Sequence, residues 1–344
     1  MSDDDMTTIA ESGSTGGAEG PDRPSISVIV PAFNEAGVIT ATLTRLTEYL
    51  RGIEDKYSWE IVVVDDGSED STRALAMEFS VVHPRVRVLQ HRHNFMMGQA
   101  LRTAFNACVS DYLVVIDCDL SYGPEHIERL VDAIIASQAK VVIASPYMKG
   151  GSCTGVPLLR YAASRCANAI LSLAASGRIK TLTGMVRAYD RRFVNALNLK
   201  AMGVEVNTEI IYKAQVLRAL VEEIPAHLDW TAIRGLPRKS TVRLASGTIR
   251  SLLSAFIFRP FMFFIVPGLI LALLGAGLVV SAWADGVSGG DDAHVAGIIG
   301  ILMGGLLCSI GISALQAKRY FEELFHLGTA ILREVRESLR SPPG

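Results

Sequence analysis

From Ser25 onward, short runs of β-branched and aliphatic residues alternate with longer stretches in which apolar residues recur at helical spacing. Helical segments are expected to begin near Ala36, Ser71, Gly98 and Pro124. Strand–helix alternation of this kind is typical of a mainly parallel sheet with right-handed crossovers. The pattern therefore predicts an α/β domain with a Rossmann-type sheet. Its strands are expected at 26–33, 59–66, 86–90, 112–117 and 140–145.

Two later stretches, 261–284 and 295–315, are apolar over their whole length and carry no charged residue. Each has about 20 residues or more, enough to cross a hydrocarbon core of roughly 30 Å. The alternative is a hairpin buried in a soluble core, but soluble helices rarely stay uncharged on all sides over such a length. The pattern predicts two membrane-spanning helices.

Basic residues lie on the outer flanks of these two segments. Arg250 and Arg259 precede the first segment, and Lys318 and Arg319 follow the second, whereas the linker 285–294 has neither Lys nor Arg. By the positive-inside rule, both flanks are expected in the cytosol. The large N-terminal domain is then cytosolic as well.

The segments beside the predicted spans are amphipathic. Residues 240–259 place apolar side chains on one helical face and Arg243 away from it, which suits a helix in the membrane interface or one packed on the preceding domain. The tail 317–344 has a second apolar stripe, suited to the interface or to pairing subunits in a homo-oligomer. Gly300 and Gly304 form a G-x-x-x-G motif, which allows close helix packing.

Composition excludes several other classes of protein. Residues 1–24 lack an apolar core and a basic start, so they are expected to form a disordered acidic tail and no signal peptide. The formal net charge of −2 gives no case for nucleic-acid binding. Five dispersed cysteines without a C-x-x-C pair fit reduced thiols and exclude a zinc knuckle or disulfide framework: Cys108, Cys118, Cys153, Cys166 and Cys308.

Acidic residues gather where the predicted strands end. Because the carboxyl ends of parallel strands meet at one edge of a sheet, these side chains are expected around the crevice where open α/β sheets bind ligands. The first strand is followed by Asn34 and the acid Glu35. The second strand ends in Asp65 and Asp66, and the fourth ends in Asp117 and Asp119.

Asp117 and Asp119 form a D-x-D motif directly after a strand that reads as buried on both faces. One interpretation is structural, with the two acids ending the strand and capping the helix that begins near Pro124. The other is a cation site. The sequence has no G-x-x-x-x-G-K-[ST], and no G-x-G-x-x-G follows the first strand, so both common phosphate-cradling loops are missing. A carboxylate-rich site then requires Mg²⁺ or Mn²⁺ to hold a nucleotide diphosphate.

Four segments in fixed order carry a resemblance to a known family: "SVIVPAFNE", "EIVVVDDGSEDST", "VIDCDLSYGPE" and "TGMVRAYDRRFV", followed by the two apolar segments. Together they resemble the family 2 glycosyltransferases of the polyprenyl-phosphate type, relatives of dolichyl-phosphate mannose synthase. The resemblance covers about Ser25 to Lys239 and implies a GT-A-like fold. It also implies transfer from a nucleotide sugar to a polyprenyl phosphate.

The resemblance implies roles for individual residues. The segment that cradles the donor's base and ribose is matched by Pro31, Phe33, Glu35, Val64 and Asp66. The motif that contacts the nucleotide sugar is matched by Asp117, Cys118 and Asp119, with Asp119 as the expected direct metal ligand. Ser121 stands where some members have a Gln that also touches the metal. The implied metal set is Asp117, Asp119 and Ser121.

The chain departs from the family pattern at two places. Pro146 stands where the family often has an arginine, so Arg160 and Arg187 are the candidates for the acceptor phosphate. Near "HLDWTAIRGLPRKS", Trp230 stands close to a second arginine position, and Lys239 is carried over as a donor contact. Arg187 has an alternative in a solvated surface or lipid headgroups, although its planar fork suits a phosphate.

The sequence thus predicts five regions: a tail (1–24), a cytosolic GT-A catalytic domain (25–239), an interface helix (240–259), a two-span hairpin (260–316) and a cytosolic amphipathic tail (317–344). The expected activity is metal-dependent, inverting sugar transfer from GDP-mannose or a UDP-sugar to a polyprenyl or dolichyl phosphate. The acceptor phosphate is itself an anionic nucleophile near neutral pH, so Asp117, Asp119 and Arg187 need only position and stabilise charge.

Two alternatives to this function remain open at the sequence level. A processive polysaccharide synthase carries a Q-x-x-R-W signature, and the closest string here, "QVLRA", lacks the Trp. A membrane-anchored nucleotide-sugar-binding subunit without turnover is the other. The sequence leaves the sugar, the base of the donor and the polyprenol open.

Overall fold

The computed structural model describes residues 23–174, 179–231, 261–284 and 291–338. The chain divides into two compact units, one containing the α/β domain and the other the apolar helices, and each is described by itself. The predicted interface helix 240–259, Lys239 and nearly all of the N-terminal tail lie outside the described residues.

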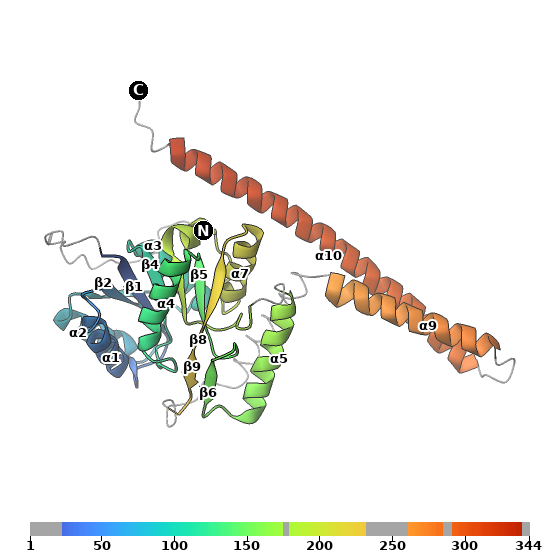
Figure 1. The fold of residues 1–344 in the computed structure, drawn as a ribbon, viewed down its shortest axis with the longest axis horizontal. Helices are drawn as coiled ribbons and strands as arrows, with labels where there is room; N and C mark the ends of the chain where they lie inside the picture. The colour runs from blue at the N-terminus through green and yellow to red at the C-terminus, as the bar shows by residue number, and fades with distance from the viewer. Residues whose placement is uncertain (1–22, 175–178, 232–260, 285–290, 339–344) are drawn as a thin grey trace. The chain divides into compact units, whose positions relative to one another are not determined.

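A seven-stranded sheet with the order β3-β2-β1-β4-β7-β5-β8 forms the centre of the first unit (Figure 1). The first four strands are parallel to one another, as the strand–helix alternation predicts. All five predicted strands are confirmed, with ends shifted by at most two residues: β1 (Ser25–Ala32), β2 (Ser58–Asp65), β3 (Val86–Gln90), β4 (Tyr112–Val115) and β5 (Val141–Ser145).

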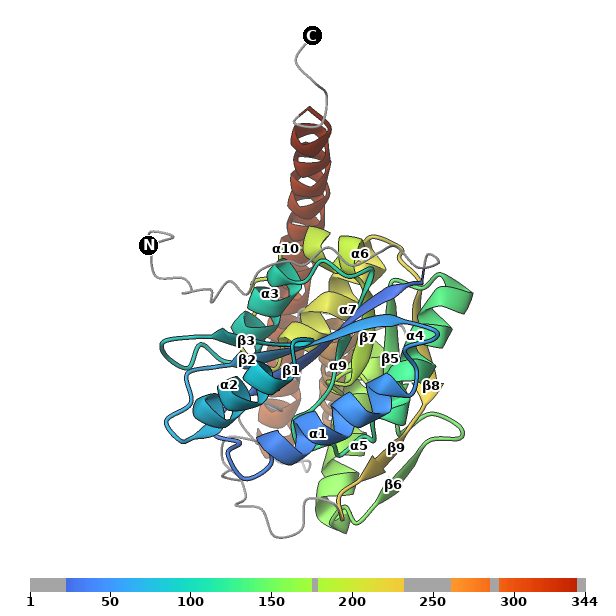
Figure 2. The same cartoon turned by 90° about the vertical axis from the view of Figure 1, so that its left-hand side faces the viewer.

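Helices cover both faces of this sheet, which is why its central strands are buried on both sides (Figure 2). Alternate residues of each strand point to opposite faces, so Val28 and Val30 join the core beneath α1 and α4, whereas Ile29 faces the other side. The helices in chain order are α1 (Ile39–Arg51), α2 (Thr72–Val82), α3 (Met97–Ala107), α4 (Glu125–Ser137), α6 (Arg191–Ala196) and α7 (Val206–Val216).

The strand order reverses between β1 and β4. From β1 the chain moves outward through β2 to β3, and β4 then returns to the opposite side of β1. In an open α/β sheet such a reversal leaves a crevice at the carboxyl ends of the two strands. The loop after β1 and the D-x-D segment after β4 lie at this switch point.

The sequence analysis missed the antiparallel strand β7 (Arg187–Asp190), which lies between β4 and β5. It also missed β8 (Val221–Pro225), which extends the sheet, and a small second sheet of β6 (Ser152–Thr154) and β9 (His227–Asp229). The short, mixed-polarity β7 gives little periodic signal. Its position in the sheet decides the environment of Arg187.

The second unit contains α9 (Val266–Ala284), preceded by one π-helical turn (Phe261–Ile265), and α10 (Asp291–Ser338). Phe263–Trp283 and Asp292–Tyr320 are long and apolar enough to cross a membrane, and only 11% and 17% of their most apolar windows are buried. A core hairpin of a soluble protein would be mostly buried. The α10 helix continues to Ser338 without a break at the expected end of the second span.

Glycines allow α9 and α10 to pack closely within this chain. A β-carbon added to Gly275 would lie 2.5 Å from the carbonyl oxygen of Gly297, and one added to Gly304 would lie 2.5 Å from that of Gly268. The G-x-x-x-G motif predicted from Gly300 and Gly304 therefore faces α9 of the same chain.

Candidate functional site

The loops after β1 and β2 are joined by side-chain to backbone hydrogen bonds. The backbone N–H of Asn34 donates to the Ser68 hydroxyl (3.0 Å), and the N–H of Glu69 donates to Asn34 Oδ1 (2.9 Å). The Glu35 N–H donates to the Thr72 hydroxyl (2.7 Å). Asn34 has a positive φ of 55°, which asparagine tolerates better than most residues. The two loops thus form one hydrogen-bonded wall beside the switch point.

The residues implied to hold the donor's base and ribose lie along this wall. Pro31 and Val64 are direct partners in the β1–β2 register, and both are buried. Phe33 and Glu35 are partly exposed just beyond the strand end. Asp66 follows β2, and its side chain is 7% exposed. The structure therefore brings together the predicted donor residues of the first two strands and the loops that follow them.

The D-x-D motif forms a tight turn directly beyond β4. The Leu120 N–H donates to the Asp117 carbonyl (3.1 Å), and the Ser121 N–H donates to Asp119 Oδ1 (2.9 Å). Leu120 has a φ of 47°, a left-handed conformation that leucine rarely adopts. Such strain is typical of functional sites when the surrounding structure enforces it.

Neighbouring elements hold this turn on both sides. The Thr42 hydroxyl on α1 donates to the carbonyl of the buried Cys118, and the Asp229 N–H at the end of β9 donates to the carbonyl of Ser121 (2.8 Å). Asp117 and Asp119 are themselves partly exposed residues. The turn is therefore fixed by its backbone while its two acids are accessible to a ligand.

These acids suit a hard divalent cation that is shared with a substrate. In the part of the chain that the structure describes, no group of three or more His, Cys, Asp and Glu residues is arranged to hold a metal without help. Mg²⁺ and Mn²⁺ sites commonly use one or two carboxylates plus phosphate oxygens and water. Asp117 and Asp119 fit such a site, and Ser121, which is buried, stays a predicted ligand.

Arg187 was expected at the acceptor phosphate or on a solvated surface, but the structure buries it completely. It is the first residue of β7, is 0% exposed, and donates to the carbonyls of Gly184 (2.8 Å), Asn207 (2.9 Å) and Leu182 (2.5 Å). Complete burial lowers the pKa of this guanidinium. In the described structure Arg187 ties the segment before β7 to α7, so its contact with a phosphate stays a prediction that the observed geometry does not favour.

Arg160 stands on α5 (Leu158–Ala174), and its guanidinium carbon lies 4.1 Å from the centre of the Trp230 ring. Trp230 follows β9, and its backbone N–H donates to the Thr154 carbonyl of β6 (2.8 Å). Trp230 stands close to a family arginine position in the sequence, and the structure places Arg160 over its ring. Of the two predicted acceptor-phosphate residues, Arg160 is exposed and Arg187 is fully buried, so Arg160 is the better placed to contact a ligand.

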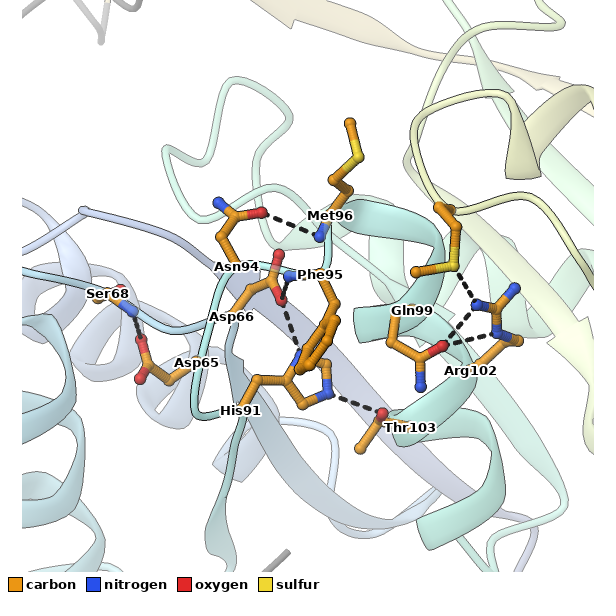
Figure 3. A network of polar contacts seen from close by, with 11 residues as sticks. Asp65, Asp66, Ser68, His91, Asn94, Phe95, Met96, Gln99, Arg102 and Thr103 are labelled. Carbon is orange, nitrogen blue, oxygen red and sulfur yellow. Dashed lines mark hydrogen bonds and ion pairs between the residues drawn. The ribbon is translucent and has the colours of Figure 1, made fainter. Parts of the chain in front are cut away.

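The sequence analysis missed His91, the first residue after β3. Its Nδ1 lies 2.7 Å from Asp66 Oδ1, and its Nε2 lies 2.8 Å from the Thr103 hydroxyl (Figure 3). The signal was available, because His91 ends a parallel strand just as Asp66 and Asp117 do. The sequence analysis considered Asn34 and the acids at the strand ends but no histidine.

An open α/β sheet with a D-x-D turn at its switch point has the arrangement expected of a GT-A-like glycosyltransferase fold. Residues 27–197 match the family model described as Glycosyl transferase family 2. The chain therefore contains a family 2 glycosyltransferase domain, as its motifs predict.

Two curated relatives and one solved structure illustrate the comparison. A dolichol-phosphate mannosyltransferase of Pyrococcus furiosus is 31% identical over 202 residues, which are 58% of this chain and 55% of the relative. A polyprenol monophosphomannose synthase of Mycolicibacterium smegmatis is 32% identical over 179 residues, 51% of this chain and 65% of the relative. The chain thus spans less than two thirds of the length of either.

The solved structure is a glucosyl-3-phosphoglycerate synthase from Mycobacterium tuberculosis in complex with Mn²⁺, uridine diphosphate and phosphoglyceric acid. It superposes on this chain with a TM-score of 0.51 at 20% identity, and the match covers 68% of this chain and 78% of the synthase chain. This likeness confirms the fold.

Proposed function

We propose that this protein transfers a sugar, with inversion, from GDP-mannose or a UDP-sugar to a polyprenyl or dolichyl phosphate at the cytosolic face of a membrane. The observation that carries the proposal is the D-x-D turn at the switch point of a domain followed, in one chain, by two helices long enough to span a bilayer. The similarity to a dolichol-phosphate mannosyltransferase and a polyprenol monophosphomannose synthase supports the choice of acceptor.

On the donor side, the hydrogen-bonded loops after β1 and β2 would hold the base and ribose, with Asp66 beside them. Asp117 and Asp119 would hold Mg²⁺ or Mn²⁺, and the solved relative that contains Mn²⁺ and a nucleoside diphosphate supports this choice. When bound, the cation supplies positive charge that stabilises the departing diphosphate. Lys239 and Ser121 are further proposed donor and metal contacts.

On the acceptor side, Arg160 would orient the lipid phosphate. A phosphate monoester has a second pKa near 6, so the acceptor is largely a dianion at neutral pH and needs no general base. The protein then contributes alignment and charge stabilisation. Stacking on Trp230 would hold the Arg160 guanidinium in one orientation before the acceptor arrives.

The proposal includes the five regions predicted from the sequence, with 25–239 as the catalytic domain and the spans as the membrane anchor. Membranes containing the full chain should convert one nucleotide sugar from a panel of GDP- and UDP-sugars into a polyprenyl-phosphate sugar, identified by mass. If sugar were transferred to soluble sugars or proteins and no glycolipid were formed, polyprenyl phosphate would be rejected as the acceptor. Donor binding without release of nucleoside diphosphate would favour the non-catalytic alternative.

A further inference from the structure

The carboxylate of Asp66 is held by the connection between β3 and α3. Its Oδ1 accepts hydrogen bonds from His91 Nδ1 (2.7 Å) and from the Phe95 N–H (3.0 Å) (Figure 3). The side chains of His91 and Asp66 are each only 7% exposed. In the described part of the chain, Oδ2 forms no hydrogen bond. The two oxygens of this acid are thus differentiated by their surroundings.

The His91 ring is itself fixed from its far side. A carboxylate oxygen can only accept, so Nδ1 carries the proton that is shared with Asp66. In the neutral ring, Nε2 then accepts from the Thr103 hydroxyl on α3, 2.8 Å away. The Phe95 ring meets the imidazole edge-on at 5.4 Å. Thr103, His91 and Asp66 form a chain of hydrogen bonds that leads from α3 to the switch-point crevice.

The loop that carries these contacts is held in a strained conformation. Met96 has φ 72° and ψ 165°, a region that almost only glycine occupies. The Asn94 side chain accepts from the Met96 N–H (2.9 Å), and the Gly98 N–H donates to the Met202 carbonyl (2.6 Å). A loop that served only to connect β3 to α3 would not need such a conformation.

We propose that His91 is a positioning residue for donor recognition, which turns Asp66 so that Oδ2 faces an N–H of the donor's nucleobase. This inference rests on the proposed function, because the role of Asp66 beside the base comes from it. With Oδ1 saturated by His91 and Phe95, a base that offers an N–H at Oδ2 binds well, and a ligand without a base gains nothing from this acid. His91 therefore controls the part of the affinity that comes from the base.

The test compares ligands with and without a base on the full chain in detergent with Mn²⁺. Binding of GDP, UDP and ribose 5-diphosphate is measured by calorimetry for the wild type, His91→Phe and His91→Asn. The side-chain nitrogen of Asn replaces Nδ1 and keeps the donor to Asp66. His93→Phe is the matched control, because His93 is exposed and lies two residues further on.

His91→Phe should weaken the preferred nucleoside diphosphate about ten- to hundredfold, as expected for losing a hydrogen bond to a charged group, with ribose 5-diphosphate unchanged. His91→Asn should recover most of this loss, and His93→Phe should bind as the wild type does. In turnover, the donor KM should rise in His91→Phe while kcat at saturating donor changes little.

Equal loss for the nucleotides and for ribose 5-diphosphate, or no recovery in His91→Asn, would overturn the role of His91 and leave the proposed function intact. A wild-type chain that binds neither nucleoside diphosphate would instead overturn the proposed function. The two failures are therefore distinguishable in one set of titrations.

Discussion

The backbone N–H of Asp229 donates a hydrogen bond to the carbonyl oxygen of Ser121 over 2.8 Å, which joins β9 to the D-x-D turn. The next residue, Trp230, carries the guanidinium of Arg160 on its ring. The segment proposed to hold the metal and the side chain proposed to hold the acceptor phosphate are thus linked through two consecutive backbone positions.

The proposed contact between Arg160 and the acceptor phosphate predicts a selective effect on the acceptor. Arg160→Ala should raise the KM for polyprenyl phosphate about tenfold or more, as expected for losing a charge-assisted contact, and leave the donor KM nearly unchanged. Arg165→Ala is the matched control, because Arg165 stands on the same helix with its guanidinium near Tyr161. Steady-state kinetics with each substrate varied in turn measures both constants. An equal rise in the two KM values would place Arg160 outside the acceptor site.

For Arg187 the structure predicts a loss of stability. Arg187→Met removes three hydrogen bonds to backbone carbonyls, two of them buried, and should lower the free energy of unfolding by about 3 kcal/mol or more. Denaturant unfolding followed by tryptophan fluorescence measures this change. A variant with wild-type stability that has lost transfer would instead restore the phosphate contact predicted from the sequence.

The glycine contacts between α9 and α10 predict a strong asymmetry between adjacent positions. Gly304→Leu should disrupt the helix hairpin, because its side chain would meet the Gly268 carbonyl, whereas Gly305→Leu should be tolerated, because nothing lies within 4 Å of a β-carbon there. The yield of monodisperse protein in detergent and its melting temperature report the difference. Equal behaviour of the two variants would contradict the described packing.

His126 predicts a pH dependence of stability. The ring is 1% exposed, its Nδ1 donates to the Gly123 carbonyl (2.9 Å), and its Nε2 accepts from the His227 N–H (3.2 Å). Burial lowers the pKa of His126 below its ordinary value of 6.5. The native state therefore prefers the neutral ring, and the unfolded chain takes up the proton first as pH falls.

The contribution of His126 is thus fully present above about pH 6.5 and is lost as pH falls toward the lowered native pKa, by at most about 1.4 kcal/mol per pH unit. His126→Phe should be less stable at neutral pH, since two hydrogen bonds are lost, and should show a flatter decline in acid. Chemical denaturation at a series of pH values measures both. An unchanged slope in the variant would show that other groups cause the decline.

The sequence predicted the parallel half of the sheet well, because strands buried on both faces appear as uninterrupted apolar runs such as Val62 to Val64. The gathering of acids at one edge of the sheet followed from the rule that the carboxyl ends of parallel strands meet there. The predicted donor roles of residues such as Pro31 and Asp66 came from the family resemblance. The burial of Arg187 was not predicted, because β7 is short and antiparallel and nothing in the local pattern showed that its first residue would be buried. The Arg160–Trp230 stack joins residues 70 positions apart, which no local pattern reveals.

Formation of the glycolipid is the most direct test of the central claim, that the D-x-D turn serves metal-dependent transfer to a lipid phosphate. Membranes containing the wild type or Asp119→Asn are incubated with the preferred nucleotide sugar, polyprenyl phosphate and Mg²⁺ or Mn²⁺, with and without a chelator, and the polyprenyl-phosphate sugar is quantified by mass. We expect the wild type to form it only without the chelator, and Asp119→Asn to fall by about a hundredfold or more while staying folded. Near-wild-type, metal-dependent product formation by Asp119→Asn would contradict the account and reduce Asp119 to the residue that accepts the Ser121 N–H.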